Sequence, residues 1–203
     1  RVEMKHLRSL MLLLTLAGCA ALKGGDRPVI LRLSPHFAAT APVRPAAAPS
    51  FAVAPVQARG LTGALRYAYV DAAAPGEIRQ AATLFWEEPP PAVLARALVA
   101  GLRMRFATVA GPDLALAADR RIVTVLDRFE EEAAGGQARA VVAFDVTQVT
   151  QGKAIWSGRY CATRPIVSAS GSMRATAFRE AMEQAVSAFA QDIATGSVTA
   201  VSC

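Results

Sequence analysis

The strongest constraint on the fold is a strand-like alternation of apolar and polar residues in the carboxyl-terminal half of the chain. Residues 121–132, 138–148 and 153–162 alternate in this way, and Gln151-Gly152 forms a tight turn between the last two segments. The first segment is expected to run into an acidic turn at Glu130–Glu132. Three successive strands joined by short turns predict an antiparallel β-meander with one buried face.

Two amphipathic helices are predicted beside this meander. The first follows Pro89–Pro91, a favourable helix start, and runs to about Phe106 with Leu94, Leu98 and Leu102 on its apolar face. The second runs from about Met173 to Ala194, and its apolar stripe comprises Phe178, Ala181, Ala185, Phe189 and Ile193. Shorter strands are expected at 29–33, 51–56, 65–70 and 78–86.

The order of these elements predicts an α+β fold. The expected sheet is mixed or antiparallel, with a β-meander in the carboxyl-terminal half and two amphipathic helices packed on one face.

The amino-terminal segment has the form of a lipoprotein signal peptide. Lys5 and Arg8 precede an apolar run that is too short for the roughly 20 residues of a membrane span. The run ends in Leu16, Ala17, Gly18 and Cys19, which resembles a bacterial lipobox. This pattern predicts cleavage before Cys19, followed by attachment of a diacylglycerol and an N-acyl chain to that cysteine. The alternative is an ordinary signal peptide with an incidental cysteine near its end.

A triacylated cysteine would hold the mature chain stably on a membrane, and alanine at position 20 favours the outer membrane. The predicted organisation is a signal peptide at 1–18, a tether at 19–27, and a single periplasmic domain at 28–195 that contains a Pro/Ala-rich connection at 34–50. A short tail at 196–203 follows.

Charge and cysteine content limit the partners and the redox state. The whole chain has a net charge of +6, and removal of residues 1–18 leaves 19 basic and 15 acidic residues with no run of Lys or Arg. This distribution argues against nucleic acid as a partner. In an oxidising compartment, Cys161 and Cys203 either form a disulfide or remain separate thiols, one buried and one at the chain end.

The sequence contains few candidate catalytic residues. The two histidines are His6, in the signal peptide, and His36, in the Pro/Ala-rich connection. The sequence contains no recognised metal-ligand spacing, nucleophile elbow, phosphate loop or dinucleotide fingerprint. Ser172 is expected to cap a helix, and Asp127 with Asp145 lies in strands without a specific spacing. We therefore predict no enzyme activity, no cofactor and no bound metal.

One short motif is more informative. Trp86, Glu88 and Pro89 form W-x-E-P ahead of the first helix. Together with Cys19 and the order of strands and helices, the motif resembles the ABC-type transport auxiliary lipoproteins (the PqiC/YmbA-like group), over residues 11–195. The chain departs from the family pattern at Gly60–Gly63, so the resemblance does not define the details of a partner-contact surface around residues 57–70.

The resemblance implies a non-catalytic role beside an inner-membrane ABC permease and ATPase and an MCE-domain protein, with phospholipid as cargo and a position at the outer membrane. A homo-oligomeric ring would present one contact surface several times. Phe85 and Trp86, with Glu88 and Pro89, are candidate interface residues. The alternative is that Trp86 closes the core beneath the first helix.

Two other functions are possible in principle. A lipid-binding carrier would need its own apolar cavity between sheet and helices, whereas the helix faces here are rich in alanine and favour close packing. A periplasmic hydrolase has no supporting residues in this sequence.

Overall fold

The structure is a computed structural model that describes residues 27–37, 49–114, 117–134, 136–197 and 203. The predicted signal peptide, the lipobox and most of the tether lie outside the described residues. Among the described residues, no helix combines the length and apolar character that a membrane span requires.

A single mixed sheet contains all the strands of the described chain. They are β1 (Val29–Leu31), β2 (Phe51–Val53), β3 (Gln57–Ala58), β4 (Arg66–Val70), β5 (Ile78–Trp86), β6 (Val109–Ala110), β7 (Arg120–Ala134), β8 (Gln137–Thr150) and β9 (Lys153–Pro165). A short 3-10 helix, η2 (Gly60–Gly63), lies between β3 and β4. The two α-helices are α2 (Pro90–Arg103) and α3 (Gly171–Thr195).

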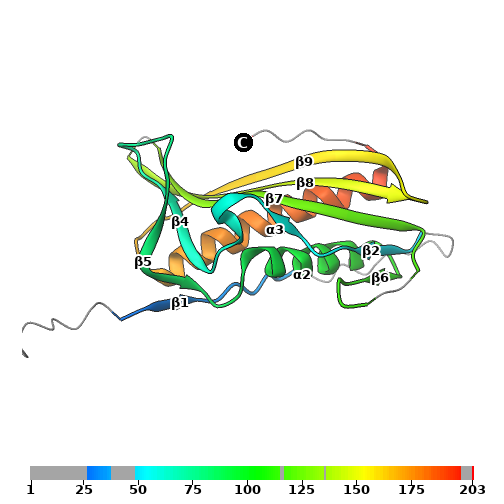
Figure 1. Ribbon diagram of the computed structural model, residues 1–203, viewed down its shortest axis with the longest axis horizontal. Coiled ribbons are helices and arrows are strands. Elements are labelled where there is room, and N and C mark those ends of the chain that lie inside the picture. The colour runs from blue at the N-terminus through cyan, green and yellow to red at the C-terminus, as the bar shows by residue number, and fades with distance from the viewer. Residues whose placement is uncertain (1–26, 38–48, 115–116, 135, 198–202) are drawn as a thin grey trace, which may run out of the picture.

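Strand β7 organises the sheet. One edge of β7 pairs in parallel with β2, β3 and β4 in turn, and its other edge pairs antiparallel with β8, which pairs with β9. Beyond β4, the sheet continues through β5 to β1, which forms an edge. The sheet curls into a half-barrel, and α2 and α3 lie together on one side of it (Figure 1). The predicted α+β class, the meander and the two helices on one face are confirmed.

The core lies between the helices and the inner face of the sheet. The predicted apolar faces are buried: Leu94, Leu98 and Leu102 of α2 and Phe178 and Phe189 of α3 have no exposed surface. On β8 the inward residues are those that alternation predicts, namely Ala140, Val142, Phe144 and Val146. The two helices approach closely at Gly101, where a Cβ atom would come within 2.6 Å of Val186 Cγ1.

Two local predictions are wrong. Glu130–Glu132 do not form a turn, because β7 continues to Ala134 and the chain reverses near Gly136, which has φ of +80°. A register shift between Leu126 and Arg128 brings Phe129 to the inner face, and the strand then continues through these glutamates, each of which has an arginine partner. Ser170, rather than Ser172, caps α3 by accepting a 3.4 Å hydrogen bond from the Met173 amide.

The face of the sheet opposite the helices carries the disulfide. Cys161 lies on β9 beside Val141 and Ala143, and it is bonded to Cys203 with a Cα–Cα distance of 5.5 Å. The bond closes a sequence separation of 42 residues that contains the whole of α3. The end of the chain is thereby attached to the sheet.

Candidate functional site at the β5–α2 corner

The W-x-E-P motif forms the corner where β5 ends and α2 begins. Trp86 is the last residue of β5, and Pro89 is the N-cap of α2, with further prolines in the first turn. The prolines fix φ at helical values and leave no amide unsatisfied at the helix start. The motif therefore serves to reverse the chain from the sheet onto the helix layer.

Trp86 belongs to the core. Its side chain is only 3% exposed, and its ring centroid lies 5.2 Å from that of Tyr67, 5.3 Å from Phe129 and 5.1 Å from Phe178. We call these four residues the aromatic cluster. The neighbouring Phe85 is half-buried, and the Arg66 guanidinium lies 5.4 Å from its ring centroid.

The two glutamates of the corner form ion pairs on the surface. Arg32 donates two hydrogen bonds to the Glu87 carboxylate, at 2.6 and 2.7 Å. Arg96, two turns along α2, pairs in the same bidentate manner with Glu88. The hydrogen bonds from Arg32 lower the pKa of Glu87 below its ordinary value. We call these four charged residues the corner ion pairs.

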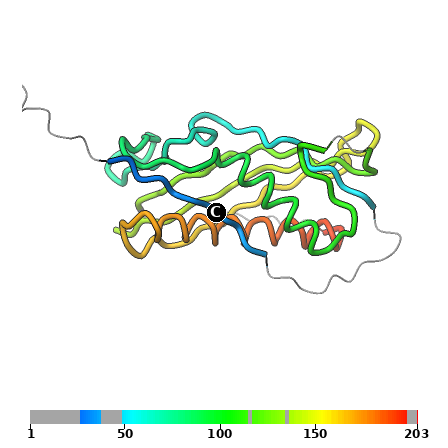
Figure 2. Tube along the Cα trace, turned by 90° about the horizontal axis from the view of Figure 1, so that it is seen from below, coloured from blue at the N-terminus to red at the C-terminus, as the bar shows by residue number. Residues whose placement is uncertain are grey.

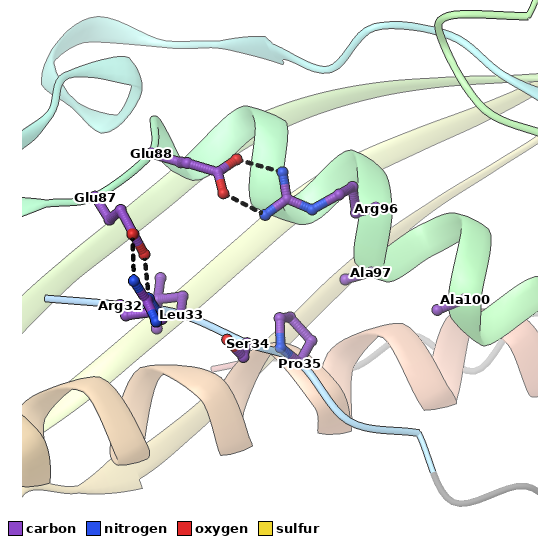
Figure 3. Close-up of a pocket in the computed structure, with 9 residues that line it drawn as sticks. All are labelled: Arg32, Leu33, Ser34, Pro35, Glu87, Glu88, Arg96, Ala97 and Ala100. Atoms are coloured by element: carbon purple, nitrogen blue, oxygen red, sulfur yellow. Dashed lines mark hydrogen bonds and ion pairs between the residues drawn. The ribbon is translucent and has the colours of Figure 1, made fainter.

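The ion pairs border a hollow of about 470 Å³ (Figure 3). Leu33–Pro35 run along one side of it, and Ala97 and Ala100 of α2 form part of the other. The lining contains no cysteine or histidine, and its carboxylates are already paired with arginine. Within the described ranges, no group of three or more His, Cys, Asp or Glu residues is arranged to hold a metal ion.

We call residues 29–36, which comprise β1 and the residues after it, the β1 segment. A second hollow, of about 640 Å³, lies on the other side of this segment, between β1 and the first half of α3. Val29, Ile30 and Ala175 contribute apolar surface to it, and His36 and Arg179 contribute polar groups. The β1 segment thus separates two surface hollows as it runs beside α3 (Figure 2).

The two aspartates that the sequence placed in strands do come together, but as a structural network. Arg159 binds Asp127 at 2.6 Å and Asp145 at 3.2 Å, and Arg59 adds a 3.0 Å contact to Asp127. The hydrogen bond from Arg159 is the main reason that the pKa of Asp127 lies below its ordinary value. His36 is held by its backbone, since its amide donates to Glu183 Oε1 at 2.6 Å.

Sequence reasoning missed one polar network in the core. Tyr67 donates a 2.5 Å hydrogen bond to Glu131 Oε2, and Arg174 of α3 binds the same oxygen at 2.8 Å. Burial and the Glu131 carboxylate both raise the pKa of Tyr67. The available signal was the alternation of β7, which places Glu131 on the same face as the buried Phe129.

Comparison with known proteins identifies the family. The family model described as "ABC-type transport auxiliary lipoprotein component" matches residues 32–194. The chain belongs to this family. Membership supports an envelope-associated lipoprotein that acts in transport, in a role for which the family description names no catalysis.

Solved structures show the same fold. The crystal structure of protein XCC0632 from Xanthomonas campestris, of family DUF330, is 20% identical in sequence and has a TM-score of 0.70, covering 80% of this chain and 92% of that one. The crystal structure of an uncharacterized protein is 13% identical and has a TM-score of 0.63, covering 83% and 99% of the two chains. No match was found among curated proteins.

Proposed function

We propose that this protein is a lipid-anchored, non-catalytic component of an ABC/MCE-type lipid-transport system. The observation that carries the proposal is the family match over residues 32–194, which covers both helices and nearly all of the sheet. In this proposal the acyl chains on Cys19 hold the domain at the periplasmic face of the outer membrane. Anchoring raises the effective concentration of the domain toward a partner that crosses the periplasm.

The filled core favours docking over lipid carriage. A carrier needs an apolar space between sheet and helices, but here Leu98, Phe144 and Phe178 occupy that layer and have no exposed surface. The hollows around the β1 segment open on the surface instead. The domain is therefore suited to presenting a rigid face to a protein partner.

We place the docking surface at the β5–α2 corner. Glu88 and Pro89 are accessible there, whereas Trp86 is buried and supports the corner from beneath. The MCE-domain protein is the proposed partner, with the permease and ATPase bound through it.

Site-specific photocrosslinking tests this placement. Benzoylphenylalanine replaces Pro89 in the full-length lipoprotein, and the matched control carries it at Lys153, an exposed position at the start of β9. We expect an adduct with the MCE protein from position 89 and none from position 153. Isolation of the lipoprotein without any ABC or MCE subunit, and without an adduct at either position, would contradict the proposed function.

Native mass spectrometry of the detergent-extracted protein tests the carrier alternative and self-association together. A lipid-free oligomer supports an adaptor that presents one surface several times. Non-covalent phospholipid bound in a fixed ratio to the protein supports the carrier.

A further inference from the structure

We infer that the β1 edge, formed by Val29 and Ile30 together with the hollow beside α3, is a membrane-contact surface that rests on the leaflet holding the lipid anchor. The inference depends on the anchor in the proposed function but not on the transport partner. It adds an orientation for the domain, with the β1 edge toward the lipid.

The first argument is exposed apolar surface. Val29 is 46% exposed and Ile30 is 67% exposed, although both belong to a strand. In the sheet, β1 pairs only with β5, so its other side borders the 640 Å³ hollow. The opposite wall, on α3, is formed by Gly171, Ala175 and neighbouring small polar residues, with Arg179 at its border. Aliphatic side chains above a shallow apolar hollow are suited to entry into the acyl-chain boundary of a bilayer.

The second argument is the polar rim. Arg32, Arg179 and His36 line the same hollow as the aliphatic residues. The Arg32 side chain is 75% exposed and its guanidinium is paired with Glu87, so the pair places polar groups at the border of the hollow while the Arg32 methylene groups cover apolar surface. Arg179 is likewise paired, with Glu183, so the apolar centre is bordered by polar, ion-paired side chains, as the layered polarity of a membrane interface requires.

The third argument is the length of chain between the anchor and the strand. Nine residues separate Cys19 from Val29. Ten extended steps span at most about 36 Å, which limits the distance between the anchored cysteine and the strand. The β1 edge is therefore held near the headgroups, whereas the β8–β9 turn lies at the opposite end of the molecule (Figure 1). Even a weak contact is well populated at such an effective concentration.

Strand addition by a second copy of the chain or by a peptide is the competing use of this edge. Strand β1 has only three residues, and such short edge strands are poor templates for strand pairing. Contact with a membrane, unlike strand addition, does not require backbone hydrogen bonds along the edge of β1. The lipid surface is therefore the occupant that these residues favour.

The test compares two probe positions in the complete lipoprotein. Ile30→Cys and Ile155→Cys each introduce a single free thiol, because Cys161 and Cys203 are already bonded to one another. Ile155 is a matched control, since it is 54% exposed and lies in β9 close to the β8–β9 turn. Each thiol receives an environment-sensitive NBD label, and the protein is reconstituted into phosphatidylethanolamine/phosphatidylglycerol vesicles that contain spin-labelled lipid.

We expect the label at position 30 to shift its emission to the blue and to be quenched several-fold more strongly by spin-labelled lipid than the label at 155. Equal quenching at both positions would overturn the inference. A blue shift at 30 without lipid quenching, which grows with protein density, would assign the edge to a second copy and also overturn it. Failure of the lipoprotein to float with the vesicles would instead overturn the anchor, and the inference with it.

Discussion

The aromatic cluster and the corner ion pairs are neighbours in the chain but are stabilised by different forces. Trp86 belongs to the buried aromatic cluster, whereas Glu87, the next residue, forms an ion pair on the surface. Truncation of a buried Phe or Trp to alanine destabilises a fold by about 3–5 kcal/mol, whereas an exposed ion pair contributes about 0–1 kcal/mol. The cluster thus stabilises the domain, and the charges of the corner remain available for recognition at little cost to the fold.

The largest expected effect tests the cluster. Phe178→Ala removes the ring that contacts Tyr67, Trp86 and Phe129, and it should lower the free energy of unfolding by about 3–5 kcal/mol in urea titrations. Ile155→Ala, at an exposed position, is the control and should change it by less than about 0.5 kcal/mol. A similar loss in both variants would show that stability does not concentrate in the cluster.

The second prediction tests the disulfide on the face of the sheet opposite the helices. Cys203→Ser removes the bond to Cys161 and should lower the free energy of unfolding by about 2–4 kcal/mol, because the unfolded chain regains the freedom of a long closed loop. A thiol reductant should destabilise the parent protein to the same extent and leave the variant unchanged. If the reductant affected both proteins equally, the bond would not be the source of the difference.

The third prediction concerns the polar network beside the cluster. Tyr67→Phe removes the hydrogen bond to Glu131 and should lower the free energy of unfolding by about 1–3 kcal/mol at neutral pH. Arg174 still pairs with the carboxylate, which limits the loss.

The same variant has a pH signature. The pKa of Tyr67 is raised in the folded protein, so this tyrosine stabilises the fold fully below about pH 10, the ordinary pKa of tyrosine, and the contribution is lost as the pH rises above that value. Tyr160, which donates to Asp192 at 3.0 Å, also has a raised pKa. Between pH 8 and about pH 11, Tyr67→Phe should therefore lose less stability than the parent, and Tyr160→Phe should behave likewise. Identical alkaline slopes in all three proteins would refute this account.

The smallest expected effect on stability is at the corner. Arg96→Ala breaks the pair with Glu88 and should change the free energy of unfolding by less than about 1 kcal/mol. The same variant should reduce crosslinking from position 89 if the corner is the docking surface. A large loss of stability would show that the corner ion pairs belong structurally with the cluster.

Local patterns account for most of the predictions that are confirmed. Period-two alternation identified β8 and its inward residues, and a period of 3.6 identified α3 and its buried stripe. α3 ends at Gly196, which adopts φ of +69° and whose amide donates to the Asp192 carbonyl, a local arrangement typical of glycine. These features depend on neighbours within a few residues, and such contacts are present in the linear pattern.

Features that depend on distant residues were predicted less well. β3 and β6 have two residues each and exist because β7 and β2 pair with them, so no local pattern marks them. The sequence predicts a turn at the acidic run of β7, and the prediction is wrong because the arginine partners of these glutamates include residues on β8 and α3 that the local pattern does not show. A charge in a strand becomes predictable only when its partner is known.

By itself, the sequence determined the fold class, the order of the main elements and the apolar faces of the two helices, because periodicity decides which side chains can be buried together. Only the tertiary structure decided that Trp86 lies in the core while Glu88 faces solvent, that Asp127 and Asp145 share Arg159, and that β1 forms an exposed apolar edge beside α3. These outcomes depend on which distant segment packs against a given residue. Contacts between residues far apart in the sequence decide this, and local periodicity does not contain them.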